Sequence, residues 1–312
     1  MSWETKAFVW VIVVEAALIV GLTIQDLFAN APMTRANRYH FEFGILFLIC
    51  ALAAAGFALS GAVRENVLEL AIFVFSLLLC CVYVAYSYVS PSPADKGGGV
   101  TPHSPAAIVR LVVVALALVV SVPLSYVVQR DFGWRSYKIV GANLELTSAF
   151  NAYSLLVGCL KLDALVAFVT LYIAAMTLLH ETGLVADSLA LILTWAGLGA
   201  AARGARKENT LLIVVFAVIA FVEPAYVAYK LIEYSEHEDE YNTRVRYLHA
   251  LIAVGVVATL IRIASLLLTL RVWTSFGKGL ASALDNAESR RADESTNFHI
   301  GISSSGTITA LA

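Results

Sequence analysis

The sequence predicts an all-α integral membrane protein of about eight transmembrane helices, arranged as two parallel four-helix repeats. Of the 312 residues, 60% are hydrophobic and only 14% are charged, whereas about one quarter of the residues in soluble domains are charged. Apolar runs long enough to cross a bilayer recur along the whole chain. Two segments in different halves of the chain also share identical residues at one spacing, which indicates an internal repeat.

Eight apolar runs are candidates for spanning helices. The first contains Glu15 and lacks both a basic start and a clear cleavage site, so we expect a retained helix and not a signal peptide. The sixth run is the shortest of the eight. The predicted spans are 7–24, 43–62, 67–89, 107–128, 154–179, 187–202, 210–232 and 248–271.

The spans divide the chain into four segments. Residues 1–128 form the first four-span repeat and residues 154–280 form the second. Between them, residues 129–153 mix polar and aromatic side chains, which is typical of an amphipathic segment at a membrane surface. Residues 281–312 are rich in Ser, Ala and charge, and we expect a mostly disordered tail.

The distribution of Lys and Arg predicts that both termini face the cytosol. An even number of spans places both termini on one side of the membrane. Twelve of the 21 Lys and Arg residues fall on that side, seven fall on the other, and Lys161 and Arg262 lie inside spans. Basic residues are in excess in cytoplasmic loops. The linker 129–153 and the tail are then cytosolic and are candidates for binding a cytosolic protein.

The repeat is clearest where 64–86 is placed over 207–229 without a gap. Identical residues meet at a constant offset, and the shared pattern begins with Glu-Asn and ends with Tyr-Val-Ala-Tyr. Each copy contains four spans, so the two copies have the same orientation, which defines a parallel repeat. The first-copy residues with identical counterparts are Glu65, Asn66, Leu68, Phe73, Tyr83, Val84, Ala85 and Tyr86.

The second copy departs from the first at Glu223–Pro224, which aligns with Cys80–Cys81. Proline lacks an N–H, so Pro224 should kink the helix and free a carbonyl nearby. A carboxylate beside an opened backbone is a typical site for a cation or a proton. The alternative is a protonated Glu223 that bonds a neighbouring carbonyl at an ordinary kink.

Four further charged residues lie in spans at a similar depth. The helical rise places Glu15, Lys161, Asp163 and Arg262 about 10 to 13 Å from the cytosolic end. Intramembrane charges usually face the bundle interior and pair. Lys161 and Asp163 point to opposite sides of their helix, so we expect their partners to be Glu15 and Arg262. This layer is an ion-pair network that fixes packing, a polar permeation or relay site, or a set of snorkelling side chains.

Glu223 lies about 20 Å from the same end, above that layer. The nearest basic residues are then about 7 Å below it, and we expect it to have no basic partner. An unpaired carboxylate at this depth should carry a proton or bind a cation.

Several classes of function are not supported by the sequence. The net charge of −2 is too small to suggest a nucleic-acid partner. The four cysteines lie in apolar runs without metal-ligand spacing, so no metal is expected. Nucleotide, phosphate and hydrolase motifs are missing from the sequence. We therefore expect a protein that is not an enzyme and has no cofactor.

Five short motifs stand out along the chain: REN at 64–66, FGWRSYKIVGAN at 132–143, CLKLD at 159–163, KENTLLIVVF at 207–216 and FGKGL at 276–280. In these motifs and their order the chain resembles an uncharacterised family of multi-pass membrane proteins known mainly from fungi, a domain of unknown function. The resemblance implies a multi-span membrane fold and no activity. We expect the protein to lie in the plasma membrane or an endomembrane of a eukaryotic cell.

Two functions remain open at this point. The buried charges and the repeat favour a transporter or channel for a small ion or solute, with a proton or small cation as the candidate ligand. The alternative is a membrane scaffold, sensor or receptor-like protein whose buried charges are structural.

Overall fold

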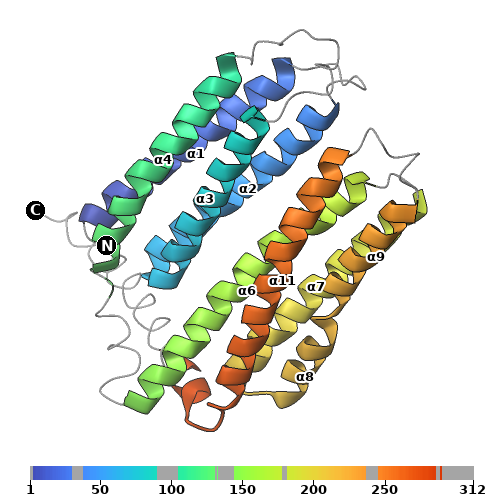
Figure 1. The fold of residues 1–312 in the computed structure, drawn as a ribbon. Helices are drawn as coiled ribbons and strands as arrows, with labels where there is room; N and C mark the ends of the chain where they lie inside the picture. Colours follow the sequence, from blue (N-terminus) through green and yellow to red (C-terminus); the bar gives the residue numbers. More distant parts are fainter. Residues whose placement is uncertain are drawn as a thin grey trace, which may run out of the picture.

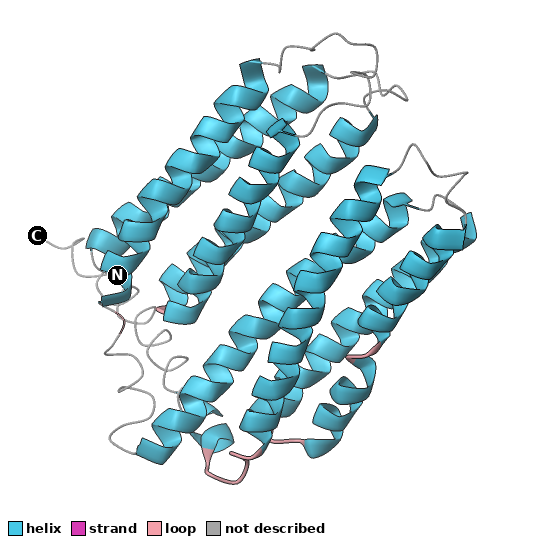
Figure 2. Ribbon diagram, viewed as in Figure 1, coloured by secondary structure: helices cyan, strands magenta, loops and turns pink. Residues whose placement is uncertain are grey.

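The structure is a computed structural model in which the described residues form long helices and no strand (Figure 2). Eight helices are long and apolar enough to cross a membrane. This result confirms the predicted all-α class and the predicted number of spans. The structure describes residues 3–29, 38–89, 105–130, 132, 144–177, 181–236, 245–285 and 289.

The first four helices form one bundle, the first unit. Each helix packs against the next, and the fourth returns to the first, so the four surround one apolar core. Phe8 and Phe73 meet edge to face in that core, with ring centroids 6.2 Å apart. The helices are α1 (Trp3–Ala29), α2 (Arg38–Arg64), α3 (Val67–Val89) and α4 (Pro105–Arg130).

The remaining helices form a second bundle beside the first, the second unit (Figure 1). Within this unit, the first and last helices pack against each other over the most residues. The seventh span is divided into two helices. The helices are α6 (Leu144–Thr177), α7 (Glu181–Arg206), α8 (Thr210–Ile219), α9 (Val222–Glu236) and α11 (Val245–Trp273).

Several helices are longer than the predicted spans. α6 begins ten residues before the predicted start at 154, and α7 extends past both ends of 187–202. A hydropathy pattern detects only the apolar part of a helix, whereas the hydrogen-bonded helix continues into polar sequence. Most of the linker 129–153 before α6 and most of the tail 281–312 lie outside the described residues.

The two units meet where α6 packs against α2 and α3. Gly158 of α6 makes this contact close, because a Cβ atom there would lie 2.8 Å from Ile72 Cδ1 of α3. Small residues allow membrane helices to approach closely. One turn further along α6, Lys161 forms an ion pair with the buried Glu69 of α3. The interface therefore contains a charged contact beside an apolar one.

Two turns at the same end of the bundles have the same conformation. Glu65 and Glu208 both adopt positive φ, 50° and 51°. The following residues, Asn66 and Asn209, each donate their N–H to the carbonyl of a glycine five residues earlier at 2.9 Å. Each asparagine side chain also accepts a hydrogen bond from the N–H two residues on, at 3.1 and 3.0 Å. These N-caps explain why α3 and α8 begin where they do.

The turn at Glu208 has an additional role. Its carboxylate accepts hydrogen bonds from the N–H groups of Gly277, at 2.9 Å, and Ala281, at 3.3 Å. Gly277 and Gly279 have positive φ, which suits glycine. Leu280 is buried at the start of the short helical segment 280–285. The chain after α11 is thus attached to the turn between α7 and α8.

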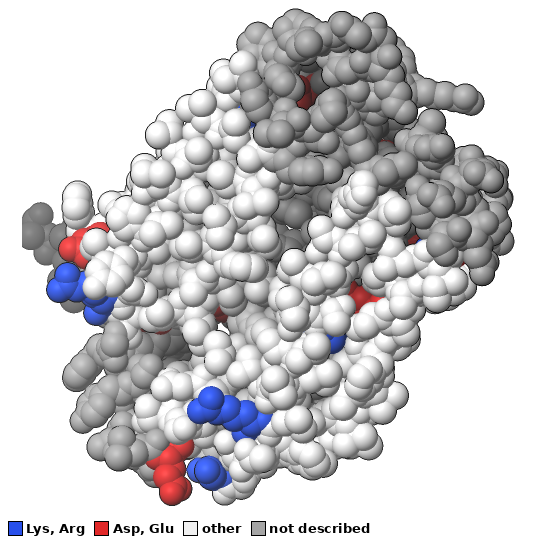
Figure 3. Space-filling model, viewed as in Figure 1, with Lys and Arg blue, Asp and Glu red and all other residues white. Residues whose placement is uncertain are grey.

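The outer surface fits a bilayer. On the face seen in Figure 3 the sides of the molecule are almost free of charged atoms, and most visible Lys and Arg side chains lie toward its lower left, next to Asp and Glu side chains. α1 begins and α11 ends at that lower left end in Figure 1. We call it the terminal end; Arg206, Lys207, Arg271 and Lys278 belong to it.

The two turns give a paired prediction on stability. Glu65 is exposed, so Glu65→Gly should raise the free energy of unfolding by about 1 kcal/mol because glycine removes the left-handed strain. Glu208→Gly removes the same strain but also two hydrogen bonds, and it should be less stable than Glu65→Gly by about 2 kcal/mol. Urea unfolding in detergent, followed by circular dichroism, measures both. Equal effects of the two changes would contradict the role given to the Glu208 carboxylate.

Candidate functional site: buried charges of the second unit

The seventh span is interrupted directly before Pro224. α8 ends at Ile219 and α9 begins at Val222. Pro224 has no N–H to donate to the carbonyl of Ala220, so the helix ladder loses one hydrogen bond at the break. Pro224 itself lies in the first turn of α9, where its fixed φ is well tolerated. The break places Glu223 at the start of a new helix, and its side chain is buried.

Three buried charged residues meet beside this break, and we call them the buried triad: Asp163 of α6, Glu223 of α9 and Arg262 of α11. Their exposed fractions are 0%, 2% and 2%. The Arg262 guanidinium donates a hydrogen bond to Glu223 Oε2. The same Nη2 atom lies 3.2 Å from Asp163 Oδ1. One guanidinium therefore joins three helices.

The prediction that Glu223 lacks a basic partner is wrong, because Glu223 forms an ion pair with Arg262. The predicted depths of Glu223 and Arg262 were sums of the helical rise along straight helices. They gave the positions of Cα atoms and left out the length of the side chains. An arginine side chain reaches several ångströms along the axis, and the break at Ala220–Phe221 interrupts the straight path of the seventh span. The predicted pairing of Asp163 with Arg262 is confirmed.

The triad contains more negative than positive charge. Two carboxylates share one guanidinium, so the formal charge is −1 when all three groups are ionised. Oε1 of Glu223, both carboxylate oxygens of Asp163 and Nε of Arg262 are buried without a hydrogen-bond partner among the described residues. Net charge without full hydrogen bonding is costly in a low-dielectric interior. A proton or a small cation at Glu223 would neutralise it.

Small polar side chains continue from the triad toward the terminal end. Ser265 and Thr269 follow Arg262 on the same face of α11 and are buried. Ser265 Oγ lies 3.3 Å from Cys159 Sγ of α6. Thr269 donates its hydroxyl to the Ser265 carbonyl at 2.7 Å. The polar face therefore extends about two helical turns beyond the triad.

A second charged group, the α7–α9 cluster, lies toward the opposite end. It consists of Asp187 of α7 with Tyr226, Lys230 and Glu233 of α9. Tyr226 donates its hydroxyl to Asp187 at 2.5 Å. Lys230 is 3% exposed, and its Nζ lies 3.9 Å from Asp187 and 3.8 Å from Glu233. The Lys230 ammonium also sits over the Tyr226 ring, 5.6 Å from its centroid.

Sequence reasoning missed the α7–α9 cluster. It counted Lys230 among the basic residues of a loop, because the residue lies near the end of an apolar run. A signal was present: Glu223, Tyr226 and Lys230 are spaced i, i+3 and i+7, so they share one face of a helix. Asp187 gave no such signal, because only the packing of α7 against α9 brings it to that face.

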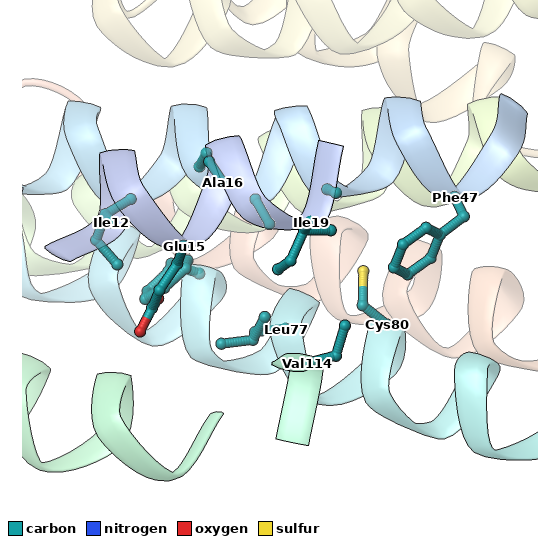
Figure 4. A pocket seen from close by; sticks show the side chains of 12 residues that line it. Ile12, Glu15, Ala16, Ile19, Phe47, Leu77, Cys80 and Val114 are labelled. Atoms are coloured by element: carbon teal, nitrogen blue, oxygen red, sulfur yellow. The ribbon is translucent and has the colours of Figure 1, made fainter. Parts of the chain in front are cut away.

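The other two predicted site residues lie elsewhere. Lys161 pairs with Glu69 at the interface between the units. Glu15 of α1 accepts a hydrogen bond from Ser121 of α4 at 2.8 Å. It borders a cavity of about 20 Å³ inside the first unit, together with Leu77 and Val114 (Figure 4). The four residues therefore do not form one network: Lys161 pairs with Glu69, Glu15 bonds Ser121, and only Asp163 and Arg262 meet each other.

Eight apolar helices with their charges paired inside define an integral membrane protein of the α-helical class. The sequence profile of the DUF7789 family, described as a domain of unknown function, matches residues 1–128 and 141–271. The chain belongs to this family. No curated protein and no solved structure matches it.

The triad gives a test of coupling. Arg262→Ala should lower the free energy of unfolding by about 3 kcal/mol, because it leaves carboxylates buried without their partner. Adding Glu223→Gln should recover part of that loss, and so should Asp163→Asn. Glu15→Gln is the matched control and should add to Arg262→Ala independently, because it lies in the other unit.

The measurement is a double-mutant cycle by urea unfolding in detergent. Full additivity between Arg262→Ala and both partner changes would show that the triad is not energetically coupled.

Proposed function

We propose that this protein is a non-enzymatic membrane transporter or channel for a small cation, with the buried triad as its ion or proton site. The observation that carries the proposal is the single guanidinium of Arg262 between two buried carboxylates, Glu223 and Asp163. Ionisable groups inside a membrane bundle are rare and typically belong to ion paths or proton relays.

The triad can exist in two charge states. With both carboxylates ionised, Arg262 is shared between them and Glu223 Oε1 is left unbonded. When Glu223 takes up a proton or a cation, the local charge becomes zero and Arg262 can pair with Asp163 alone. Binding and release at Glu223 would thus change which helix Arg262 is tied to. That is the kind of coupling between occupancy and helix position that transport requires.

The break in the seventh span would allow this change in the partner of Arg262 to move α9. α8 and α9 are separate helices, so α9 can tilt relative to α8 about Ala220–Phe221. α9 contains Glu223 and also three members of the α7–α9 cluster. Its polar face runs from Glu223 to Lys230, a rise of about 10 Å. A shift of α9 would therefore move both charged groups together.

The proposed path through the second unit connects these charged groups. It begins at Glu233, whose side chain is 31% exposed, passes Lys230 and Asp187, and reaches the triad. Ser265 and Thr269 continue it toward the terminal end. The two charged groups contain four carboxylates and two cations, an excess that favours a positively charged ligand.

We further propose that the two units are copies of one four-helix ancestor. The equal turns at Glu65–Asn66 and Glu208–Asn209 support this idea. So does the return of the last helix to the first in each unit. Under this proposal, Glu223 stands where the first unit has the buried Cys80, and ion handling is a specialisation of the second unit.

Reconstitution tests the proposed function. In liposomes with an entrapped pH dye and a potassium diffusion potential, the purified protein should produce a proton flux above that of empty liposomes. A flux of sodium or potassium under the same potential would identify a cation ligand instead. Glu223→Gln keeps the size of the side chain but cannot ionise, so the flux should fall at least tenfold, the scale of a lost charge contact of about 1.4 kcal/mol. Glu15→Gln should leave it unchanged.

A flux that survives Glu223→Gln would remove the triad from the path. The absence of any proton, sodium or potassium flux would favour the alternative of a membrane scaffold, sensor or receptor-like protein. In that case the buried charges are structural, and the linker 129–153 and the tail 281–312 would bind a cytosolic partner.

The orientation is a separate proposal. We propose that the terminal end faces the cytosol in a eukaryotic plasma membrane or endomembrane, because basic residues gather there. An epitope tag at the C-terminus of the protein should be protected from an impermeant reagent in intact cells and should react after permeabilisation. A tag that reacts in intact cells would reverse the orientation.

A further inference from the structure

Lys230 lies at the mouth of the proposed path but does not extend into water. It is three residues before the end of the seventh span, Thr210–Glu233, and Asp187 beside it is two residues after the start of the sixth, Val185–Arg206. Both positions are near the membrane surface that is farther from the terminal end. A lysine so close to the end of a span can extend its ammonium to water. The Lys230 side chain is instead 3% exposed, so its charge is held inside the protein.

Two carboxylates and one aromatic ring face the Lys230 ammonium. Its Nζ atom lies 3.9 Å from Asp187 Oδ1 and 3.8 Å from Glu233 Oε2. The centroid of the Tyr226 ring is 5.6 Å from the same atom. Carboxylates attract cations by their charge, and the face of an aromatic ring attracts them by its quadrupole. These are the surroundings that a free monovalent cation would also select.

Asp187 also has an oxygen atom without a partner. Its Oδ1 atom accepts a hydrogen bond from the hydroxyl of Tyr226 at 2.5 Å. Its Oδ2 atom is buried and has no hydrogen-bond partner within the part of the chain that the structure describes. The residue as a whole is 5% exposed. Because an unpaired buried acceptor is costly, this oxygen is an open position for a cation or a proton that enters from the mouth of the path.

Lys230 decides which of these two can enter. When all groups are ionised, its ammonium and the carboxylates of Asp187 and Glu233 give a formal charge of −1, and without Lys230 the charge would be −2. A sodium or potassium ion would meet this ammonium at the position that attracts cations most, and like charges repel strongly where water is excluded. A proton differs, because it binds to a single oxygen atom and needs no space of its own.

We propose that Lys230 is a tethered cation, fixed to the chain in the place where a free monovalent cation would otherwise bind. The consequence for the path rests on the proposed function: sodium and potassium are excluded at the mouth, so the ligand is a proton. Asp187 Oδ2 is then the first acceptor of that proton, and the Tyr226 hydroxyl holds the Asp187 carboxylate beside the ammonium. The tethered cation itself does not depend on transport.

Thermal unfolding of the purified protein in detergent tests the tethered cation without any transport. Lys230→Ala removes the ammonium and leaves space beside two carboxylates, so sodium, potassium or propylammonium chloride should stabilise it saturably. Propylammonium replaces the atoms that the substitution removes. At several times the dissociation constant of the cation, the unfolding midpoint should rise by about 2 °C relative to N-methylglucamine chloride at equal ionic strength. The parent protein should respond equally to all four salts, because its own lysine fills the site.

Three further variants make the response specific. Lys230→Arg keeps the charge and should behave like the parent protein. Lys230→Ala combined with Asp187→Asn should lose the response of the single variant, because one of the two carboxylates is gone. Lys230→Gln keeps most of the side chain without its charge. It should also be stabilised by sodium or potassium, and it takes the place of Lys230→Ala if that variant fails to fold.

Four results would overturn the proposal. They are no cation response in Lys230→Ala and Lys230→Gln, a saturable sodium or potassium response in the parent, a response that survives Asp187→Asn, and a sodium or potassium flux through the parent in liposomes. A proton flux through the parent without a cation response in the variants would reject the tethered cation alone. No flux of any ion, together with a cation response in Lys230→Ala, would confirm the tethered cation and reject the proposed function.

Discussion

A charge that is buried in hydrocarbon needs a partner, and this requirement organises the second unit. Arg262 is almost fully buried, and its guanidinium reaches carboxylates on two other helices. Removing an ion from water costs several kcal/mol unless attraction and hydrogen bonds offset it. Only a few arrangements of α6, α9 and α11 allow this contact, so the charges restrict the helix packing to a degree that apolar contacts alone do not.

The same requirement explains the contrast between the units. The core of the first unit is apolar, and its charged contacts are single ones: Glu15 with Ser121, Arg110 with Asp26, and Glu69 with Lys161 of the second unit. The second unit contains the triad and the α7–α9 cluster, and its seventh span is broken beside them. A broken helix is tolerated in a membrane where freed backbone groups lie inside protein. The helix break, Pro224 and the buried charges therefore occur together because freed backbone groups and buried charges both need partners inside the protein.

The interface between the units combines two kinds of contact. Near the terminal end, Gly158 allows a close approach and Lys161 pairs with Glu69. Toward the other end the helices enclose an apolar cavity with Ser76 in its wall. The close contact sets the distance between the units, and the cavity marks where they separate. Both features involve α6, the longest helix, which also contains Asp163 of the triad.

The sequence by itself determined the class of fold, the eight spans and three of the buried charged residues, Asp163, Glu223 and Arg262. It did not indicate the buried Glu69, Asp187 or Lys230. A helix that crosses the hydrocarbon core of a bilayer must be long and apolar, so the composition and the length of the apolar runs are enough to identify the spans. The sequence also indicated Pro224 as a disturbance of the seventh span. The helix ends were less certain, as α6 shows, because an apolar pattern does not record where the hydrogen-bonded helix stops.

Only the tertiary structure decided which charges meet. Helical rise predicts similar depths for Glu15, Lys161, Asp163 and Arg262, and depth is all that a helical rise provides. Their partners depend on the rotation of each helix about its axis and on the reach of each side chain. Those quantities are fixed by packing between residues far apart in the chain, as for Arg262 and Glu223 or Lys161 and Glu69. The cavity at Ser76 has the same origin, since it exists only where four helices from both units come together.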